Sequence, residues 1–312
     1  MKRVLLFLAT ILFFCGINFP QEKLPLTEKD LEKFTYYFEI QDNKLVGNGA
    51  NFLLEEIKNS QFVLLGEYHR SYQISKFTQA IIPFYHDAGC RFFGLEIGHV
   101  SSEILADLSK ESSKTIESVK AFNSDNYVKT KRSFYTAIPF FSYVEDAEFL
   151  VEARKRNWNL IGLDQEFTFG YVPLFQRMYE NLNSKKKAAL KTSLVQIIAS
   201  IKSLYEADIN GSGNLYKSIQ ESKEINVFLD AASKDNPQNQ RIAKAIKVTT
   251  EIYNYNKIGK YYENNNSRAV YMKKNLSESF AKLKFDLTKD KMLLKMGSKS
   301  KIEDLRSFWP IS

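Results

Sequence analysis

An apolar segment that ends in a polar turn decides the fold: residues 61–70 read QFVLLGEYHR. Residues 61–65 form a compact apolar run that is typical of a buried strand, and Gly66 ends it. Apolar side chains then recur at helical spacing over residues 73–88, and Gly89 follows as a C-terminal helix cap. The order of strand, polar turn and helix is the unit from which parallel sheets are built.

The same pattern recurs further along the chain. Residues 91–96 read RFFGLE and residues 159–163 read NLIGL, and an amphipathic helix is predicted over residues 140–157 between them. A last strand is predicted over residues 292–296, which Gly297 ends. Short apolar strands that alternate with helices predict an α/β fold, with a mainly parallel sheet flanked by helices.

The stretch from 182 to 262 has a different character. Strand patterns are absent there, and helices are predicted with breaks at 210–213 (NGSG) and 235–237 (DNP). We therefore predict an all-helical insertion at 182–262 in an α/β core that consists of residues 22–181 and 263–312.

The first residues have the features of an export signal. Lys2 and Arg3 give a positive start, and residues 4–14 form an apolar run that is shorter than the ~20 residues needed to span a bilayer. We expect residues 1–21 to be a signal peptide and the mature protein to be periplasmic or secreted. The alternative is a buried N-terminal strand or helix. Lipidation of Cys15 stays open, and it is the one route to membrane association that we predict.

Composition and charge narrow the classes of partner. The chain has 312 residues, of which 44% are hydrophobic, and this is enough for a packed core. Its net charge is +8, but the basic residues are spread over helical faces, with short clusters at 185–187 and 295–301. No stripe of arginines interleaved with aromatic residues is present, so we expect solvated surfaces and no nucleic-acid partner. Cys90 is expected to be a packed apolar residue. The oligomeric state is left open.

Polar residues gather where the predicted strands end. Ligands of parallel α/β sheets bind beyond the carboxyl ends of the strands, and these ends carry Glu67, His69, Glu96 and Asp164. Three acids and an imidazole in one crevice could bind a metal, or shift the pKa of one member for general acid–base catalysis. Taken singly, each also has a plainer role as a helix cap, turn hydrogen bond or salt-bridge partner. His99 follows closely enough to reach the same crevice.

Four motifs, in this order, resemble those of the superfamily of erythromycin esterase-like and ChaN-like (haem-binding uptake, Tiki) proteins. The motifs are FVLLGEYHRSYQISKF at 62–77, FFGLEIG at 92–98, NLIGLDQEF at 159–167 and SRAVYMKKNL at 267–276. The spacing of Gly66, Glu67 and His69 is closer to the ChaN-like pattern, because the esterases usually place two residues between Glu and His. Each motif is short, and only the ordered set is specific.

The resemblance implies an exported hydrolase that acts on an ester or a similar small organic substrate. His69 would be the base that activates water, and Glu67 and Glu96 would orient and polarise the reacting groups. Arg268 would bind an anion or orient the other groups, and stabilise developing negative charge. The expected catalytic residues are therefore Glu67, His69, Glu96 and Arg268, and the expected substrate-binding residues are Tyr68, Arg70, Asp164 and His99.

The resemblance leaves two other functions open. A ChaN-like protein would bind haem or iron through Tyr or His side chains, and a degenerate relative would have no ligand chemistry. Esterases of the family act without metal whereas the Tiki proteases depend on one, so no cofactor or metal ligand is assigned, and haem and a divalent metal stay as alternatives. The family usually has a histidine after the last strand, where this sequence has Ser300. We expect either a weakened site or a truncated C-terminus.

Overall fold

The structure is a computed structural model that describes residues 27–130 and 134–297. The predicted signal segment, Cys15 and Ser300 lie outside these ranges. The chain divides into two compact units, residues 1–37 and 38–312. In the first unit, Thr27 caps the short helix α2 (Glu28–Glu32). None of the helices in the described ranges is long and apolar enough to cross a bilayer.

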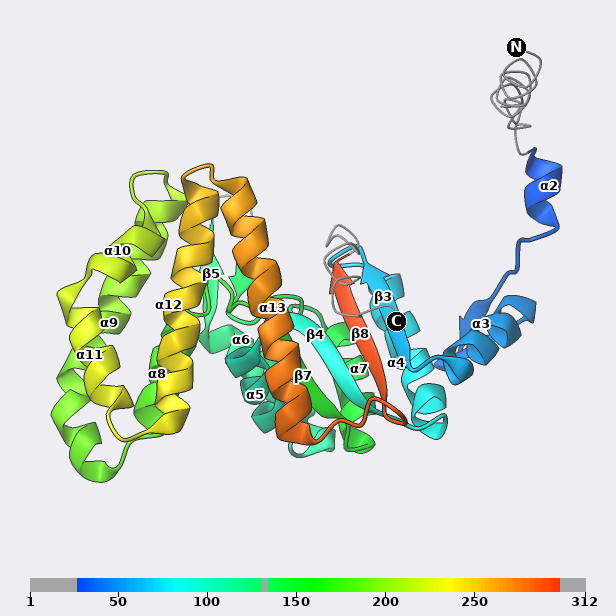
Figure 1. Ribbon diagram of the computed structural model, residues 1–312, viewed down its shortest axis with the longest axis horizontal. Helices are drawn as coiled ribbons and strands as arrows, with labels where there is room; N and C mark the ends of the chain where they lie inside the picture. Colours follow the sequence, from blue (N-terminus) through cyan, green and yellow to red (C-terminus); the bar gives the residue numbers. More distant parts are fainter. Residues whose placement is uncertain (1–26, 131–133, 298–312) are drawn as a thin grey trace, which may run out of the picture. The chain divides into compact units, whose positions relative to one another are not determined.

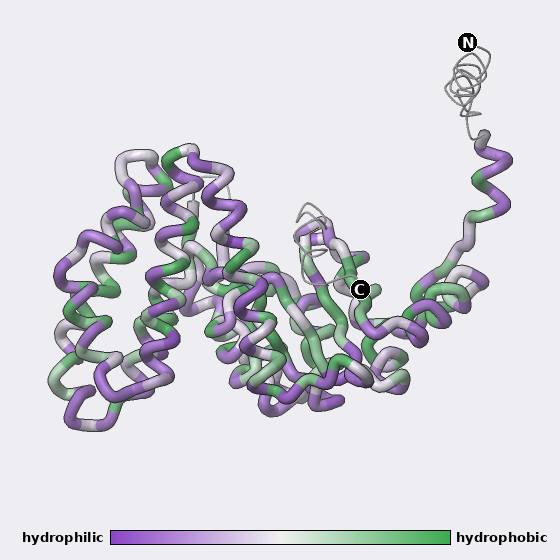
Figure 2. The backbone as a smooth tube through the Cα atoms, viewed as in Figure 1, coloured by the Kyte–Doolittle hydropathy of each residue, from purple (hydrophilic) through white to green (hydrophobic). Residues whose placement is uncertain are grey.

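Four parallel strands form the central sheet of the second unit, in the order β3-β8-β4-β7 (Figure 1). They are β3 (Phe62–Glu67), β8 (Lys291–Gly297), β4 (Cys90–Gly98) and β7 (Asn159–Asp164). All four apolar runs that were predicted as strands are strands, and they are hydrophobic over most of their length (Figure 2). The strand that comes last in the sequence lies between the first two, so that Lys295 pairs with Leu65 on one side and Leu95 on the other.

Different helices cover the two faces of this sheet. On one face α4 (Tyr72–Asp87) and α7 (Val144–Lys155) pack over the large core that includes Leu293. On the other face α13 (Tyr261–Leu283) packs over a smaller cluster that includes Met292. The predicted α/β class, a parallel sheet flanked by helices, is therefore confirmed.

Every element between β7 and β8 is helical. Before α13 these are α8 (Tyr171–Glu180), α9 (Ser184–Ile209), α10 (Leu215–Glu221), α11 (Lys223–Ser233) and α12 (Pro237–Lys257). They pack on one another, and α12 also packs along α13 (Figure 1). The predicted break at 210–213 lies between α9 and α10, and the one at 235–237 ends at Pro237, the first residue of α12. Asn214 and Asn236 cap the helices that follow. The insertion boundaries at 182 and 262 stay a prediction.

Two short hairpins have no counterpart in the sequence prediction. They are β1 (Glu39–Gln41) with β2 (Lys44–Val46), and β5 (Tyr127–Lys129) with β6 (Phe134–Thr136). Strands of three residues are too short to show alternation, although Asp42 and Asn43 at φ 50° and 58° supply the left-handed turn that a two-residue hairpin needs. The remaining elements are α3 (Asn48–Asn59), α5 (His99–Leu108), a 3-10 turn at Ser112–Lys114 and α6 (Thr115–Asp125).

Candidate active site

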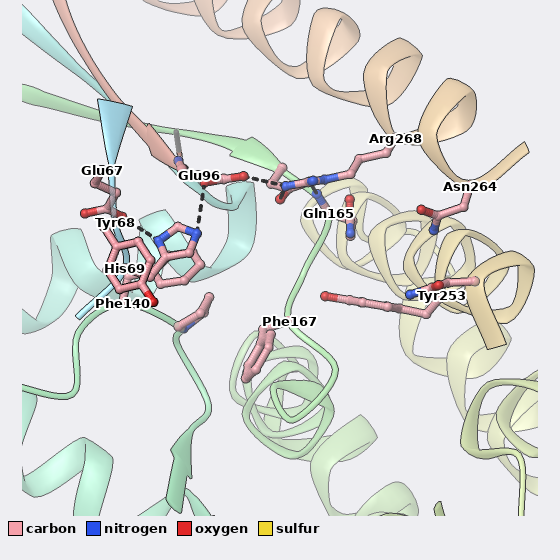
Figure 3. A pocket seen from close by; sticks show the side chains of 14 residues that line it. Glu67, Tyr68, His69, Glu96, Phe140, Gln165, Phe167, Tyr253, Asn264 and Arg268 are labelled. Atoms are coloured by element: carbon pink, nitrogen blue, oxygen red, sulfur yellow. Dashed lines mark hydrogen bonds and ion pairs between the residues drawn. The ribbon is translucent and has the colours of Figure 1, made fainter. Parts of the chain in front are cut away.

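Predicted site residues meet at a common cavity (Figure 3). They come from the carboxyl ends of three strands and from one helix. Glu67 ends β3, Glu96 lies near the end of β4, Asp164 ends β7, and Arg268 comes from α13. The cavity has a volume of about 600 Å³. Tyr68 and His69 lie just beyond β3 and also line it.

His69 lies between two carboxylates. Its Nδ1 is 2.9 Å from Oε1 of Glu67, and its Nε2 is 3.7 Å from Oε2 of Glu96. The ring stacks on Phe140 with centroids 3.9 Å apart, while 38% of the side chain stays exposed. A neutral imidazole carries one N–H, so the short contact assigns the proton to Nδ1 and leaves Nε2 as the free basic nitrogen.

A buried lysine completes the Glu67 side of the site. Lys295 on β8 is 3% exposed, donates to Oε2 of Glu67 and lies over the ring of Phe149 with its Nζ 5.2 Å from the centroid. Burial raises the pKa of Glu67, but the hydrogen bond from His69 and the charge of Lys295 outweigh it and hold this pKa below its ordinary value. The prediction of a solvated cluster at 295–301 is therefore wrong for Lys295, because its strand is internal to the sheet.

Asp146 on α7 places a further carboxyl group near Lys295. It accepts hydrogen bonds from Oγ of Ser75 at 2.7 Å and from the backbone N–H of Tyr143 at 3.4 Å. Burial raises the pKa of Asp146, although the hydrogen bond from Ser75 and the charge of Lys295 oppose the increase. The sequence gives no sign of this residue beyond an acid in the first turn of a helix, which is a common capping position.

Arg268 joins the two acids on the other side of His69. Its Nε donates to Oδ1 of Asp164 at 2.9 Å, and its Nη2 donates to Oδ2 of Asp164 at 2.5 Å and to Oε1 of Glu96 at 2.6 Å. Burial lowers the pKa of the guanidinium, but the charges of both acids outweigh it and raise this pKa. Burial also raises the pKa of Asp164, against the opposing charge of Arg268. The planar fork thereby ties β4 and β7 to α13.

Gly297, the last residue of β8, permits the close approach of His69. Its backbone N–H donates to Oε2 of Glu96 at 2.5 Å. A Cβ at this position would lie 2.7 Å from Nε2 of His69 and 3.1 Å from Oε2 of Glu96. Because Cβ contacts below 3.0 Å essentially do not occur in real structures, the ring would have to move.

Two of the predicted substrate-binding residues lie outside this cavity. Arg70 is exposed, at φ 69°, with its guanidinium 5.5 Å from the centre of the Tyr135 ring. His99 is the first residue of α5 and lines a second cavity, where its Nδ1 lies 3.5 Å from the hydroxyl of Tyr271. The expected common crevice therefore does not include His99, because the helix starts there and brings its side chain against α13.

The helical region contributes the wall opposite His69 (Figure 3). Tyr253 and Asn256 come from α12, Asn264 comes from α13, and Gln165 and Phe167 follow β7. The sequence did not single out Tyr253, Asn256 and Asn264, because polar and aromatic side chains on amphipathic helices look the same whether they face solvent or a cavity. Gln165 and Phe167 lie within the motif at 159–167 but were not assigned to the site.

The acids and the imidazole of the site are not arranged as a metal centre. Within the described ranges, no three His, Cys, Asp or Glu side chains are arranged to hold a metal ion. Glu67, Glu96 and Asp164 already pair with Lys295 or Arg268, which a divalent ion would have to displace. Both ring nitrogens of His69 face carboxylates. The arrangement therefore does not fit a divalent metal, nor a haem iron bound through His69.

A known structure resembles the chain at low identity. No protein-family model and no curated protein matches it. A solved structure of an erythromycin esterase variant in its open conformation matches with a TM-score of 0.47 and 16% sequence identity, covering 84% of this chain and 67% of that one. A similarity this distant does not carry an argument about activity.

Proposed function

We propose that the protein is an esterase-like hydrolase in which His69 activates water. One observation carries the proposal: an imidazole is held through Nδ1 by a buried carboxylate, while its Nε2 lies at the edge of a cavity of about 600 Å³. Imidazole is the side chain best suited to take and return a proton near neutral pH. The carboxylate of Glu67 favours the imidazolium that forms when His69 takes a proton.

The reaction needs only water and the ester. Nε2 of His69 takes a proton from water as the water oxygen adds to the carbonyl carbon, and the electron pair of the C=O bond moves onto its oxygen. When this intermediate collapses, the bond to the leaving alkoxide breaks, and the imidazolium returns its proton to that oxygen. The products are a carboxylic acid and an alcohol. Oε2 of Glu96, 3.7 Å from Nε2, is placed to orient the attacking water.

Arg268 is better suited to orient Glu96 than to stabilise an oxyanion. It is shared between the carboxylates of Glu96 and Asp164. With both acids ionised, the three groups together carry a net negative charge, and such a cluster attracts a developing anion only weakly. In this proposal Arg268 holds Glu96 against the water site, which differs from the anion-stabilising role that the resemblance suggested.

The wall opposite His69 supports a proposal for the class of substrate. The rings of Phe167 and Tyr253 provide apolar faces, and the side chains of Gln165, Asn256 and Asn264 provide amides. Pockets for small organic molecules typically combine apolar surface with a few such polar groups. We therefore propose a small organic ester or lactone as the substrate.

Removal of the imidazole tests the proposal. In His69→Ala we expect kcat/KM for esters and lactones in a chemically varied panel to fall by roughly 10²–10⁴-fold, the usual contribution of a general base. His86→Gln is the matched control, because His86 lies on α4 and does not line the cavity. The glutamine keeps an acceptor for the indole N–H of Trp158, which donates to Nδ1 of His86 in the wild type. Equal turnover by wild type and His69→Ala on every hydrolysed ester would refute the proposal.

Export is a separate proposal. It rests on residues 1–21, which lie outside the described ranges. N-terminal sequencing of protein recovered from outside the cytoplasm should give a start near residue 21, whereas a cytoplasmic protein that starts at Met1 would contradict it. The haem-binding and inactive alternatives stay predictions.

A further inference from the structure

We infer that Lys295 is a positioning residue of this site: through Glu67 it fixes the orientation of His69 and keeps its imidazole free to act as a base. The inference rests on the proposed function. Lys295 itself does not line the cavity, so it would act on the reaction only through its neighbour.

The position of Lys295 is one that an apolar side chain would fill. Leu293 and Lys295 are two positions apart along β8, so their side chains share the face that α4 and α7 cover. Lys295 is 3% exposed and packs over Phe149. Burying an ammonium group is costly unless a carboxylate compensates it. Packing alone therefore does not explain a lysine here, whereas its contact with Glu67 does.

The two oxygens of Glu67 are divided between two donors. Oε2 accepts from Lys295, and Oε1 accepts from Nδ1 of His69 at 2.9 Å. With both oxygens engaged, the carboxylate plane cannot turn without breaking one of these bonds, so the ring of His69 is held in one orientation. The lysine also offsets the charge that Glu67 presents to the ring.

The sign of the electrostatic effect follows from this arrangement. Without Lys295, the uncompensated carboxylate of Glu67 would favour the imidazolium, and His69 would stay protonated to higher pH. A protonated ring cannot accept a proton from water, so the acidic limb of the rate profile would shift to higher pH. The titratable or charged groups around His69 and its partners include Glu67 on β3, Tyr68 after it, Glu96 on β4, Asp146 on α7, Asp164 on β7, Arg268 on α13 and Lys295 on β8.

Asp146 does not take over the task of Lys295. It is an acid, so it would add to the negative charge near Glu67, and it is bound to Ser75 and to the backbone of Tyr143. Among the described residues, Lys295 is the cation that contacts Glu67 directly. Its replacement therefore removes the local compensation.

Kinetics against pH form the first arm of the test. For Lys295→Met we expect kcat/KM at neutral pH to fall roughly tenfold to a hundredfold, the usual effect of removing a partner that orients a reacting side chain. The midpoint of the acidic limb should rise by roughly one pH unit. Lys295→Arg keeps the charge and should keep the midpoint. Lys291→Met is the matched control, since this lysine on the same strand binds the backbone of Lys58 instead.

The second arm does not depend on activity. The chain has three histidines, so ¹⁵N-histidine labelling gives three pairs of ring signals, one pair for each imidazole, and His69→Ala and His86→Gln assign them. In wild type we expect the His69 ring to carry its proton on Nδ1 once it is neutral. In Lys295→Met its titration midpoint should rise by roughly one unit, whereas a purely structural role would lower the amount of folded protein and leave the midpoint unchanged. Unchanged ring titration in folded Lys295→Met would overturn the inference.

A third comparison guards against misfolding of the single variant. The double variant Glu67→Gln with Lys295→Met removes both charges of the buried pair together. Loss of both partners is usually less destabilising than loss of one, which leaves a buried charge uncompensated. If Lys295 acts through Glu67, adding Lys295→Met to Glu67→Gln should change kcat/KM by less than about threefold. A further loss of tenfold or more would overturn the inference. If instead neither wild type nor any variant hydrolyses an ester, the proposed function fails, and the ring titration still decides the role of Lys295.

Discussion

Two ion-pair clusters flank His69, and they hold their acids in different ways. On the face of α4 and α7, Lys295 is 3% exposed, and its ammonium group compensates the charge of one carboxylate, that of Glu67. On the face of α13, the guanidinium of Arg268, whose side chain is 31% exposed, forks onto Glu96 and Asp164. The lysine is a point charge within one sheet, whereas the arginine is a planar clamp between two strands and a helix.

The difference shows that the two halves of the site depend on different parts of the fold. The Lys295 cluster is complete once β8 has paired between β3 and β4. The Arg268 cluster also needs α13 to dock on β7. Changes at α13 should therefore disturb geometry and stability together, while changes on β8 should alter the state of the imidazole.

Among changes to the two clusters, the largest effect is expected for Arg268→Met, which leaves the carboxylates of Glu96 and Asp164 without this cation. We expect kcat/KM to fall by at least roughly a hundredfold, and the free energy of unfolding to fall by about 3 kcal/mol, since loss of one partner of a buried pair is strongly destabilising. Urea unfolding and ester kinetics measure the two effects. Arg268→Lys is the conservative control. Its kcat/KM and its free energy of unfolding should lie between those of wild type and Arg268→Met, because an ammonium group keeps the charge but cannot reproduce the fork. Full activity in Arg268→Met would mean that Glu96 needs no orientation.

A smaller effect is expected at the strand end between the two clusters. In Gly297→Ala the new methyl group would lie 2.7 Å from Nε2 of His69, so the ring must shift. We expect a roughly tenfold loss of kcat/KM with a loss of stability of only about 1 kcal/mol. The contrasting variant is Gly211→Ala, where φ is 74° and nothing lies within 4 Å of the added Cβ. It should cost about 1 kcal/mol through backbone strain and leave kcat/KM unchanged. Equal kinetics in both variants would show that His69 tolerates displacement.

The strands and one cluster were predictable from sequence for local reasons. Apolar runs that end in glycine or acid marked the strands β3, β4, β7 and β8, and the strand-end rule brought Glu67, Glu96 and Asp164 to one edge. Arg268 entered only through the motif SRAVYMKKNL, because a helical arginine by itself indicates a solvated surface.

Lys295 could not be predicted, because its environment is set at long range. In the sequence KMLLKMGSKSK it resembles the other lysines of a basic segment. It becomes buried because β8 pairs between β3 and β4, and its partner Glu67 lies 228 residues away. The residues opposite His69 share this difficulty, since the face of α12 that meets the cavity depends on how α12 packs against α13. His99 was predicted at the wrong place for a local reason. The helix α5 begins at His99, immediately after β4 ends at Gly98, so its side chain does not lie at the strand-end cavity.

The smallest effect on activity is expected outside both clusters, at His99. Burial, together with the charge of Arg241, lowers the pKa of His99 from 6.5 to about 4, so the folded state resists a proton that the unfolded chain accepts. As pH falls from about 6.5 to about 4, protonation of His99 therefore favours the unfolded state, and the free energy of unfolding decreases from its value at neutral pH. In His99→Gln this part of the acid sensitivity should disappear. The free energy of unfolding, measured with urea, should fall between pH 7 and pH 4.5 by about 2 kcal/mol less than it does in wild type. At pH 7, kcat/KM of His99→Gln should stay within about twofold of wild type, because His99 lines the second cavity. A tenfold loss of kcat/KM with unchanged acid sensitivity would show that the second cavity is coupled to the two clusters around His69.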